Sequence, residues 1–182
     1  MNRTEIPLET PRLHLEPVLR RHAPLLFEAL SDESIYAYIP NDPPSSVAYL
    51  AARFERLESR QSPDGLEVWL NWVMRVKATS RCVGLVQVTI RPEGLALLAY
   101  ELTQAFRGQG FASEACAAVI AEVFEHYAVT AIVAYVDTRN VPSMRLLERL
   151  GFSRGEYISR ADYFKGAWSD EFVYARGSGQ AT

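Results

Sequence analysis

The residues best suited to chemistry lie in one stretch of the chain, AYELTQAFRGQGFASEACAAVIAEVFEHYA. An apolar strand is followed there by an arginine, by the glycines Gly108 and Gly110, and then by a regular apolar helix. The first backbone N–H groups of a helix have no partner within the helix, and the helix dipole favours negative charge at that end. The small residues Ala112 and Ser113 leave room for a bulky anion close to the backbone. The pattern predicts an anion-binding loop, most naturally for a phosphate or a pyrophosphate.

Three explanations compete for two glycines between a strand and a helix. The glycines can simply make a tight turn. A P-loop is disfavoured, because lysine and Ser/Thr do not follow the glycines in the required order. A dinucleotide-binding loop fits in part: Gly108 and Gly110 are correctly spaced, Ser113 stands where a third glycine or alanine belongs, and Asp137 ends the next strand. That motif requires a parallel βαβ framework, so the direction of the strands before the loop tests the dinucleotide-binding interpretation.

Three strands are predicted before the loop, at residues 68–76, 82–90 and 95–102. The first alternates apolar and polar side chains, so we expect it to be half-buried, whereas the third is continuously apolar and suits a strand buried on both faces. Short turns join the three into an antiparallel meander, which argues against the dinucleotide motif. A long apolar stripe predicts a helix from Phe111, and a crossover leads from it to a parallel strand at 131–136.

The two ends of the chain complete a mixed α/β (α+β) architecture. Before the meander we expect a strand at residues 12–18, a helix at 21–31 and a second helix capped by Ser45 or Ser46. After it, Asn140 is suited to cap a short helix, and an alternating stretch predicts a closing hairpin.

Composition limits the class of protein. The 182 residues include 19 Lys and Arg against 22 Asp and Glu, a net charge of −3 that gives no reason to expect a nucleic-acid or membrane partner. We expect a single domain at residues 1–176 and a flexible tail at 177–182. The cysteines Cys82 and Cys116 lack CxxC spacing and are expected to be packed free thiols in a reducing compartment. With no membrane-spanning or signal segment, the expectation is a soluble cytoplasmic protein.

Several segments together resemble one enzyme family. RGQGFA, at residues 107–112, is similar to the Q/R-x-x-G-x-G/A signature of the GCN5-related N-acetyltransferases (the GNAT family), which cradle the pyrophosphate of acetyl-coenzyme A. TPRLHLEPV, AYEL, GFASEA, NVPSMRLLERLGF and KGAWSDEFVYA resemble, in this order, the RimJ/RimL-like subgroup, which acetylates protein N-termini. The resemblance covers roughly residues 8 to 176.

The resemblance implies a mostly antiparallel central sheet flanked by helices, with two strands splayed at the cofactor wedge. Acetyl-CoA would be the co-substrate, without a metal. The residues that would hold it are Leu102 and Thr103 beside the pantetheine arm, the loop Arg107, Gly108, Gln109, Gly110, Phe111, Ala112 and Ser113 around the pyrophosphate, and Asn140 and Ser143 on the next helix.

Catalytic roles follow from the same resemblance. The backbone N–H of Leu102 would point at the thioester oxygen, and Glu101 is the candidate general base, acting directly or through water. Glu101 could instead pair with a cation or only position the acceptor. Relatives place a proton-donating tyrosine where this chain has Leu147, so Ser143 is the candidate donor to the leaving thiolate, or else a helix-start serine bonded to local backbone. We expect Asn140 both to cap its helix and to touch the pantetheine arm.

The acceptor is expected to be a primary amine, with a protein or peptide N-terminus favoured, attacking acetyl-CoA directly in a ternary complex. Its groove would be built from the loop between the first two helices and the late hairpin, around Tyr36, Tyr38, Asn41, Trp72 and Tyr163. A catalytically silent acyl-CoA-binding module and an NAD(P)-binding oxidoreductase stay open as alternatives. Monomer and homodimer are both compatible with the sequence.

Overall fold

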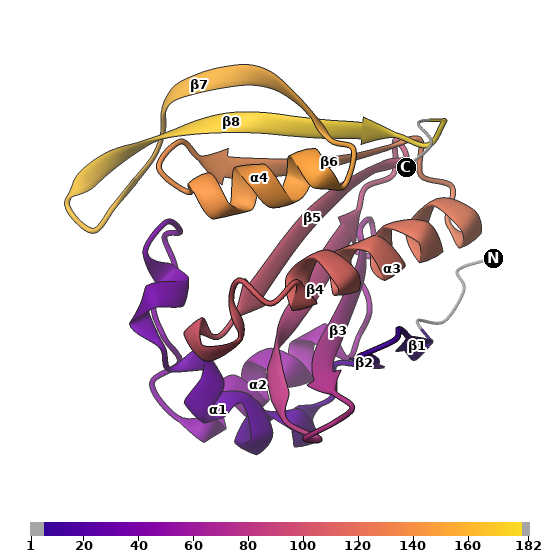
Figure 1. Cartoon of the computed structure of the whole chain (residues 1–182), viewed down its shortest axis with the longest axis vertical. Coiled ribbons are helices and arrows are strands. Elements are labelled where there is room, and N and C mark those ends of the chain that lie inside the picture. The colour runs from indigo at the N-terminus through magenta and orange to yellow at the C-terminus, as the bar shows by residue number, and fades with distance from the viewer. Residues whose placement is uncertain (1–5, 180–182) are drawn as a thin grey trace.

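The computed structural model describes residues 6–179 and places them in one eight-stranded sheet with helices against both faces (Figure 1). The strand order is β1-β2-β3-β4-β5-β6-β8-β7, and every neighbouring pair is antiparallel except β5 and β6. The strands are β1 (Leu8–Glu9), β2 (Leu13–Pro17), β3 (Val68–Val76), β4 (Cys82–Ile90), β5 (Leu95–Leu102), β6 (Ala131–Asp137), β7 (Ser153–Phe164) and β8 (Ala167–Gly177). The helices are η1 (Arg20–His22), α1 (Ala23–Leu30), η2 (Glu33–Tyr36), α2 (Val47–Leu57), η3 (Gln104–Phe106), α3 (Phe111–His126) and α4 (Val141–Arg149).

The predicted mixed, mostly antiparallel sheet is confirmed. β3, β4 and β5 form the expected meander, and β6 is parallel to β5 after the α3 crossover. Short polar segments escaped prediction: β1 has only two residues, and the two 3₁₀ turns η2 and η3 carry no periodic pattern. Both η turns lie beside the candidate site described below.

Two apolar clusters hold the helices against the sheet. The larger lies under α3 and α4, where residues such as Ala115, Val119 and Leu146 pack on the sheet. The smaller joins α1 and α2 to β3 and β4 through Leu26, Phe54 and their neighbours. The sheet is therefore covered on both faces, but by different helices over different strands.

The expectation of a half-buried β3 is wrong. Val73 is fully buried and Asn71 is only 3% exposed, because α1 and α2 cover the face that the alternating pattern assigned to solvent. The backbone carbonyl of Asn71 accepts a hydrogen bond from Val18 N at 2.7 Å, which ties this face to the entry of α1.

The expectation that β5 is buried on both faces is also wrong in part. Leu98 and Leu102 are buried beneath α3 and α4, but Ala99 is exposed and Leu97 only half-buried on the opposite face. The smaller cluster takes its sheet residues from β3 and β4 and does not extend over β5. The apolar run of β5 thus includes a strip that faces an open side of the sheet.

β5 and β6 separate soon after they begin to pair. Their parallel register joins Leu95 to Ala131, Ala96 to Ile132 and Leu97 to Val133, and it stops there although the strands continue to Leu102 and Asp137. α3 leads from the separated end of β5 back to the paired start of β6, and α4 follows the separated end of β6 (Figure 1). This gap is the splay that the family resemblance implies.

The C-terminal end differs slightly from the expected boundary. β8 continues through Gly177, and Ser178 N donates a hydrogen bond to Thr130 O at 3.0 Å. Residues 180–182 of the expected tail lie outside the described residues. Cys82 and Cys116 are free and buried, as expected.

A glycine allows β4 to approach β5 where the latter carries Glu101. A Cβ atom on Gly84 would overlap the carbonyl oxygen of Glu101 and lie 2.7 Å from Met74 Cε. We expect Gly84→Ala to lower the free energy of unfolding by about 1–3 kcal/mol, because it overpacks this contact. Urea unfolding measures the change. Gly155→Ala is the control, since its Cβ would lie 3.4 Å from the nearest atom, and an equal loss in both variants would contradict the prediction.

Candidate active site

The glycine loop ends in a left-handed cap on α3. Gly108 has φ +74° and Gly110, the N-cap residue, has φ +83°. L-amino acids with a side chain adopt this region rarely, so both glycines are used for their backbone conformation. No side chain caps the helix, which leaves its first turn available to a ligand.

The amides of residues 108–113 have no hydrogen-bond partner among residues 6–179. On either side the backbone is satisfied: Arg107 N donates to Gln104 O at 3.1 Å, and Glu114 N donates to Gly110 O at 3.0 Å. A Cβ atom on Gly108 would meet nothing within 4 Å. The open amides fit an anion, as the sequence predicts, but Arg107 N is not one of them.

The loop is held from outside by a residue that the sequence analysis did not single out. Arg12 donates from Nη1 to Gln109 O at 2.8 Å, pairs with Glu114 Oε2 at 2.6 Å, and places its guanidinium 4.5 Å from the centre of the Phe111 ring. Arg12 lies within the segment TPRLHLEPV, which carries part of the family resemblance. That resemblance is the sequence feature that could have pointed to Arg12.

Glu114 in the first turn of α3 anchors the N-terminal strand region to this loop. Its Oε1 accepts hydrogen bonds from Thr10 Oγ1 at 2.6 Å and from the backbone N–H of Arg12 at 2.8 Å. Burial alone would raise the pKa of Glu114, but these hydrogen bonds and the Arg12 charge lower it below its usual value. The carboxylate therefore stays charged at the positive end of the helix dipole.

At the end of β5, Leu102 is the residue whose N–H faces the gap. Thr103 N donates to Val83 O at 3.0 Å, on the β4 side, and backbone groups alternate between the two sides of a strand. The N–H of Leu102 therefore points the other way, toward the side where β6 has diverged. Its carbonyl accepts Arg107 Nε at 3.1 Å.

Thr103 is less suited to hold a ligand through its backbone than the sequence analysis expected. Its N–H is bonded to Val83, and its carbonyl accepts a hydrogen bond from Phe106 N at 3.0 Å. Both groups are used to turn the chain from β5 into η3.

Glu101 is a buried carboxylate with one oxygen left over. Its side chain is 10% exposed; Oε1 lies 3.4 Å from Arg53 Nη2 on α2, and the buried Oε2 has no hydrogen-bond partner among the described residues. The cation of the pairing alternative is therefore present, whereas the role of Glu101 as general base stays a prediction. A buried oxygen without a partner is costly, so this atom points to a ligand or a water.

On the other side of β5, Tyr100 reaches α4. Its hydroxyl forms a 2.9 Å hydrogen bond with Ser143 Oγ. Asn140 caps α4, with Oδ1 accepting Ser143 N at 3.2 Å, which confirms the capping prediction. Ser143 Oγ itself bonds to Tyr100 and not to the backbone of its own helix. Leu147, where relatives carry tyrosine, is buried in the core.

The five residues expected around the acceptor do not all meet. Trp72 points to the opposite face, fully buried, with Nε1 donating to Ile6 O at 2.9 Å, and therefore does not line the groove. Tyr36 is buried and donates its hydroxyl to Leu30 O at 2.8 Å, and burial, followed by the nearby Glu101 charge, raises its pKa. It lies under the site instead of on its surface.

Asn41 does line a hollow beside Glu101. Together with Arg53 and Trp69 it borders a cavity of about 580 Å³ between α2, β3 and the loop before α2. The centre of the Tyr38 ring lies 5.9 Å from Arg139 Cζ. Tyr163 is 57% exposed on the hairpin, and its ring centre lies 5.2 Å from that of Trp168. Trp69, three residues before the expected Trp72, is the tryptophan of β3 that lines this cavity.

The β7–β8 hairpin is tied to the loop before α2. Lys165, at the hairpin turn, donates from Nζ to the carbonyl oxygens of Tyr36, Ile39 and Asn41. This contact joins the elements that follow β6 to the loop that lies beside the end of β5.

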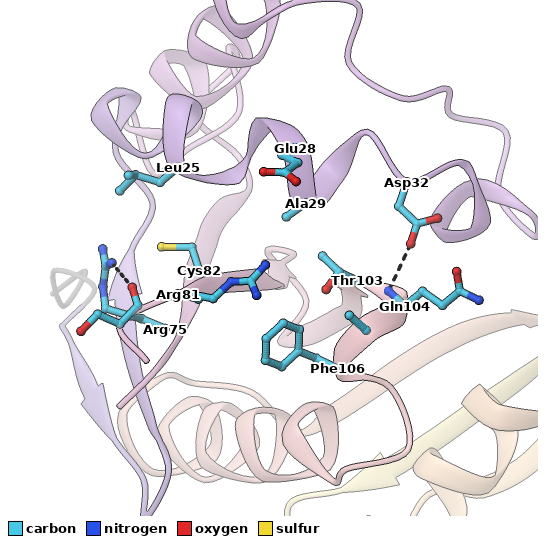
Figure 2. Close-up of a pocket in the computed structure, with 12 residues that line it drawn as sticks. Leu25, Glu28, Ala29, Asp32, Arg75, Arg81, Cys82, Thr103, Gln104 and Phe106 are labelled. Carbon is cyan, nitrogen blue, oxygen red and sulfur yellow. Dashed lines mark hydrogen bonds between the residues drawn. The ribbon is translucent and has the colours of Figure 1, made fainter. Parts of the chain in front are cut away.

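A second cavity of about 510 Å³ lies on the α1 side of residues 103–106 (Figure 2). Asp32 spans its edge by accepting the backbone N–H of Gln104 at 3.1 Å, and Cys82 lies at its floor. Burial raises the pKa of the Cys82 thiol. This cavity is separated from the gap between β5 and β6 by the segment that turns into η3.

Two absences concern the described part of the chain. Residues 6–179 contain no cluster of three His, Cys, Asp or Glu side chains that could hold a metal ion. They also contain no helix long and apolar enough to span a membrane.

The dinucleotide-binding alternative is wrong. β5, α3 and β6 form one parallel crossover around the loop, but the strands before it, β3, β4 and β5, form an antiparallel meander, so the sheet lacks the parallel framework of a dinucleotide-binding fold. Asp137 is buried and already bonded to Arg139 and to Ser169 Oγ at 2.7 Å, so its carboxylate is not available to a ribose.

Comparisons with known proteins agree on a family. The model of the acetyltransferase (GNAT) domain matches residues 12–153. The N-acetyltransferase p20 of Bacillus licheniformis is 26% identical over 171 residues, which cover 92% of this chain and 94% of that protein. The ribosomal-protein-S5-alanine acetyltransferase of Vibrio fischeri superimposes with a TM-score of 0.85 at 18% identity, covering 96% of this chain and 98% of the other. The ribosomal L7/L12 α-N-protein acetyltransferase RimL, solved with coenzyme A, gives a TM-score of 0.83 at 19% identity and the same coverage. With its splayed strands and open glycine loop, the chain belongs to the GNAT family and is an acetyl-CoA-dependent N-acetyltransferase.

Proposed function

We propose that this enzyme acetylates the α-amine of a peptide or protein N-terminus by direct attack on acetyl-CoA in a ternary complex. The observation that carries the proposal is Glu101, a buried carboxylate at the parted end of β5 with Oε2 unpartnered. An amine that approaches the gap from the open face of the sheet can donate a proton to this oxygen.

The pKa of the acceptor favours an α-amine over a lysine. A free α-amine has a pKa near 8 and a lysine near 10.4, so at pH 7.5 about a quarter of the former and about a thousandth of the latter is neutral. An α-amine therefore asks less of a general base than a lysine does. Two proteins that share this fold are named as a ribosomal L7/L12 α-N-protein acetyltransferase and a ribosomal-protein-S5-alanine acetyltransferase.

The residues present fit acetyl-CoA. The amides of residues 108–113 would bind the pyrophosphate, and the open space at Gly108 would admit it. The Leu102 N–H would hold the arm and stabilise charge that develops on the thioester oxygen. Bound there, acetyl-CoA supplies an activated acyl group that an amine can attack.

Ser143 and Asn140 complete the cofactor side. Asn140 fixes the start of α4, and Ser143 then presents its hydroxyl at the gap, where it would donate a hydrogen bond to the departing sulfur. Glu101 and Ser143 lie on opposite faces of β5. In this proposal Glu101 accepts the proton of the amine, and Ser143 donates a hydrogen bond to the sulfur. On the acceptor side, Asn41 borders the cavity that Arg53 also lines, and the Tyr38 ring lies near Arg139, just before α4.

The acceptor class is tested with one peptide in two forms. The first has a free N-terminus and blocked lysines; the second has a blocked N-terminus and one free lysine; spermidine is a third acceptor. We expect kcat/KM for the free N-terminus to exceed the others at least tenfold, measured by mass spectrometry and thiol release. A preference for lysine or spermidine, or no transfer to any of the three acceptors, would remove the N-terminal assignment.

The pyrophosphate assignment predicts a specific loss in Gly108→Glu. Added bulk and negative charge in front of the open amides should weaken acetyl-CoA binding at least tenfold, about 1.4 kcal/mol, as measured by calorimetry. Gly65→Glu is a matched control, because Gly65 has φ +73° and likewise no neighbour within 4 Å of its Cβ. Equal affinity in the two variants would refute the assignment.

Glu101→Gln tests the general base. We expect kcat to fall by about 100-fold while the KM for acetyl-CoA is little changed, because proton removal is lost and the cofactor contacts remain. Steady-state kinetics with the preferred peptide checks this. Glu125→Gln, on an exposed carboxylate of α3, is the control; wild-type turnover in Glu101→Gln would leave Glu101 with a structural role only.

A further inference from the structure

Tyr100 occupies a place in the site that neither its sequence position nor the family signature assigns to it. It belongs to the part of β5 that no longer pairs with β6, and its side chain points to the face covered by α3 and α4. Ser143 stands in the first turn of α4, which follows β6. Within residues 6–179, the Tyr100–Ser143 hydrogen bond of 2.9 Å is the one side-chain hydrogen bond that joins the separated end of β5 to α4.

The relative acidity of the two hydroxyl groups decides which way this hydrogen bond runs, because each hydroxyl can donate or accept. Burial raises the pKa of Tyr100 to about 12, more than the hydrogen bond with Ser143 lowers it. The phenol is therefore protonated and is the stronger acid of the two hydroxyl groups. Tyr100 acts as donor and Ser143 Oγ as acceptor.

A serine hydroxyl has one hydrogen and two acceptor positions. Since Oγ receives the Tyr100 hydrogen, the serine's own hydrogen must point elsewhere, and it has no acceptor among the described residues. It is thereby free for a group in the gap. The donation from Tyr100 also makes that hydrogen more acidic, because successive hydrogen bonds polarise one another.

We propose that Tyr100 is a positioning residue that aims and acidifies Ser143 as the hydrogen-bond donor to the leaving sulfur, in place of the tyrosine missing at Leu147. The inference rests on the proposed role of Ser143. In the reaction, the amine nitrogen forms the C–N bond with the acyl carbon, and the C–S bond breaks with its electron pair going to sulfur. The nitrogen loses one proton to Glu101, and the sulfur leaves as a thiolate that accepts a hydrogen bond from Ser143, which keeps its own proton. Solvent then takes the proton from Glu101 and supplies one to the thiolate, so that protons balance over the cycle.

The expected result is a coupled loss of turnover. Tyr100→Phe keeps the packed ring and should lower kcat about tenfold with the KM for acetyl-CoA unchanged, and Ser143→Ala should lower it more. In the double variant Tyr100→Phe should add nothing, because it acts only through Ser143. Tyr174→Phe is the matched control: Tyr174 is fully buried, and its hydroxyl bonds to Glu148 at 3.0 Å on the other side of α4.

A change of leaving group separates this role from a structural one. Selenolate is a much weaker base than thiolate and needs less stabilisation on departure, so the deficits of Tyr100→Phe and Ser143→Ala should shrink with acetyl-seleno-CoA. Ser143→Thr, which keeps a hydroxyl, should restore turnover to within a fewfold of wild type.

The outcomes distinguish the role of Ser143 as donor from the role of Tyr100 in positioning it. Wild-type turnover in Ser143→Ala removes the proposed donor itself. A loss in Ser143→Ala with none in Tyr100→Phe, a full additional loss in the double variant, or a deficit that is the same with selenium overturns the role of Tyr100 alone.

Discussion

Two neighbouring parallel strands that pair over only three residue pairs determine most of this molecule's architecture. Beyond Leu97 and Val133 the edges of β5 and β6 face each other without a ladder. Unpaired backbone groups inside a protein are costly, so a gap of this kind persists only where the surrounding packing holds it. Here α3 and α4 cover one face and keep the sheet continuous through the large core cluster, which leaves the N–H of Leu102 presented to the gap.

Two carboxylates near the gap differ in how fully their oxygens are hydrogen-bonded. Glu114 receives hydrogen bonds from Thr10 and twice from Arg12, and its lowered pKa reflects a site in which every partner favours the charged form. Glu101 shares one oxygen with Arg53 and has no partner for the other. The first arrangement stabilises a loop, whereas the second leaves a reactive group incompletely satisfied. The same residue type thus serves structure on one side of the loop and, by our proposal, chemistry on the other.

The elements with regular periodicity could be predicted closely. The apolar stripe of α3 and the short turns between β3, β4 and β5 locate the meander and the crossover, and they place the glycine loop at the start of a helix. The burial of β3 was harder to predict, because alternation along the strand cannot show that α1 and α2 cover Asn71 and Val73.

The residues of the acceptor groove were the hardest part of the site to predict. Residues 32–46 have no period, so the sequence could not show that Tyr36 turns inward. Trp72, in contrast, shares its strand face with Met74, which alternation alone places under the larger cluster.

The contacts of Lys165 have a consequence for the shape of the gap. At one end, the short ladder between β5 and β6 holds the two strands at a fixed separation. At the other end, one ammonium group on the hairpin whose strand β8 pairs with β6 binds three carbonyl oxygens of the loop beside β5. The two strands are therefore connected at both ends of the gap, and at the far end the width of the gap depends on Lys165 together with the Tyr100–Ser143 hydrogen bond.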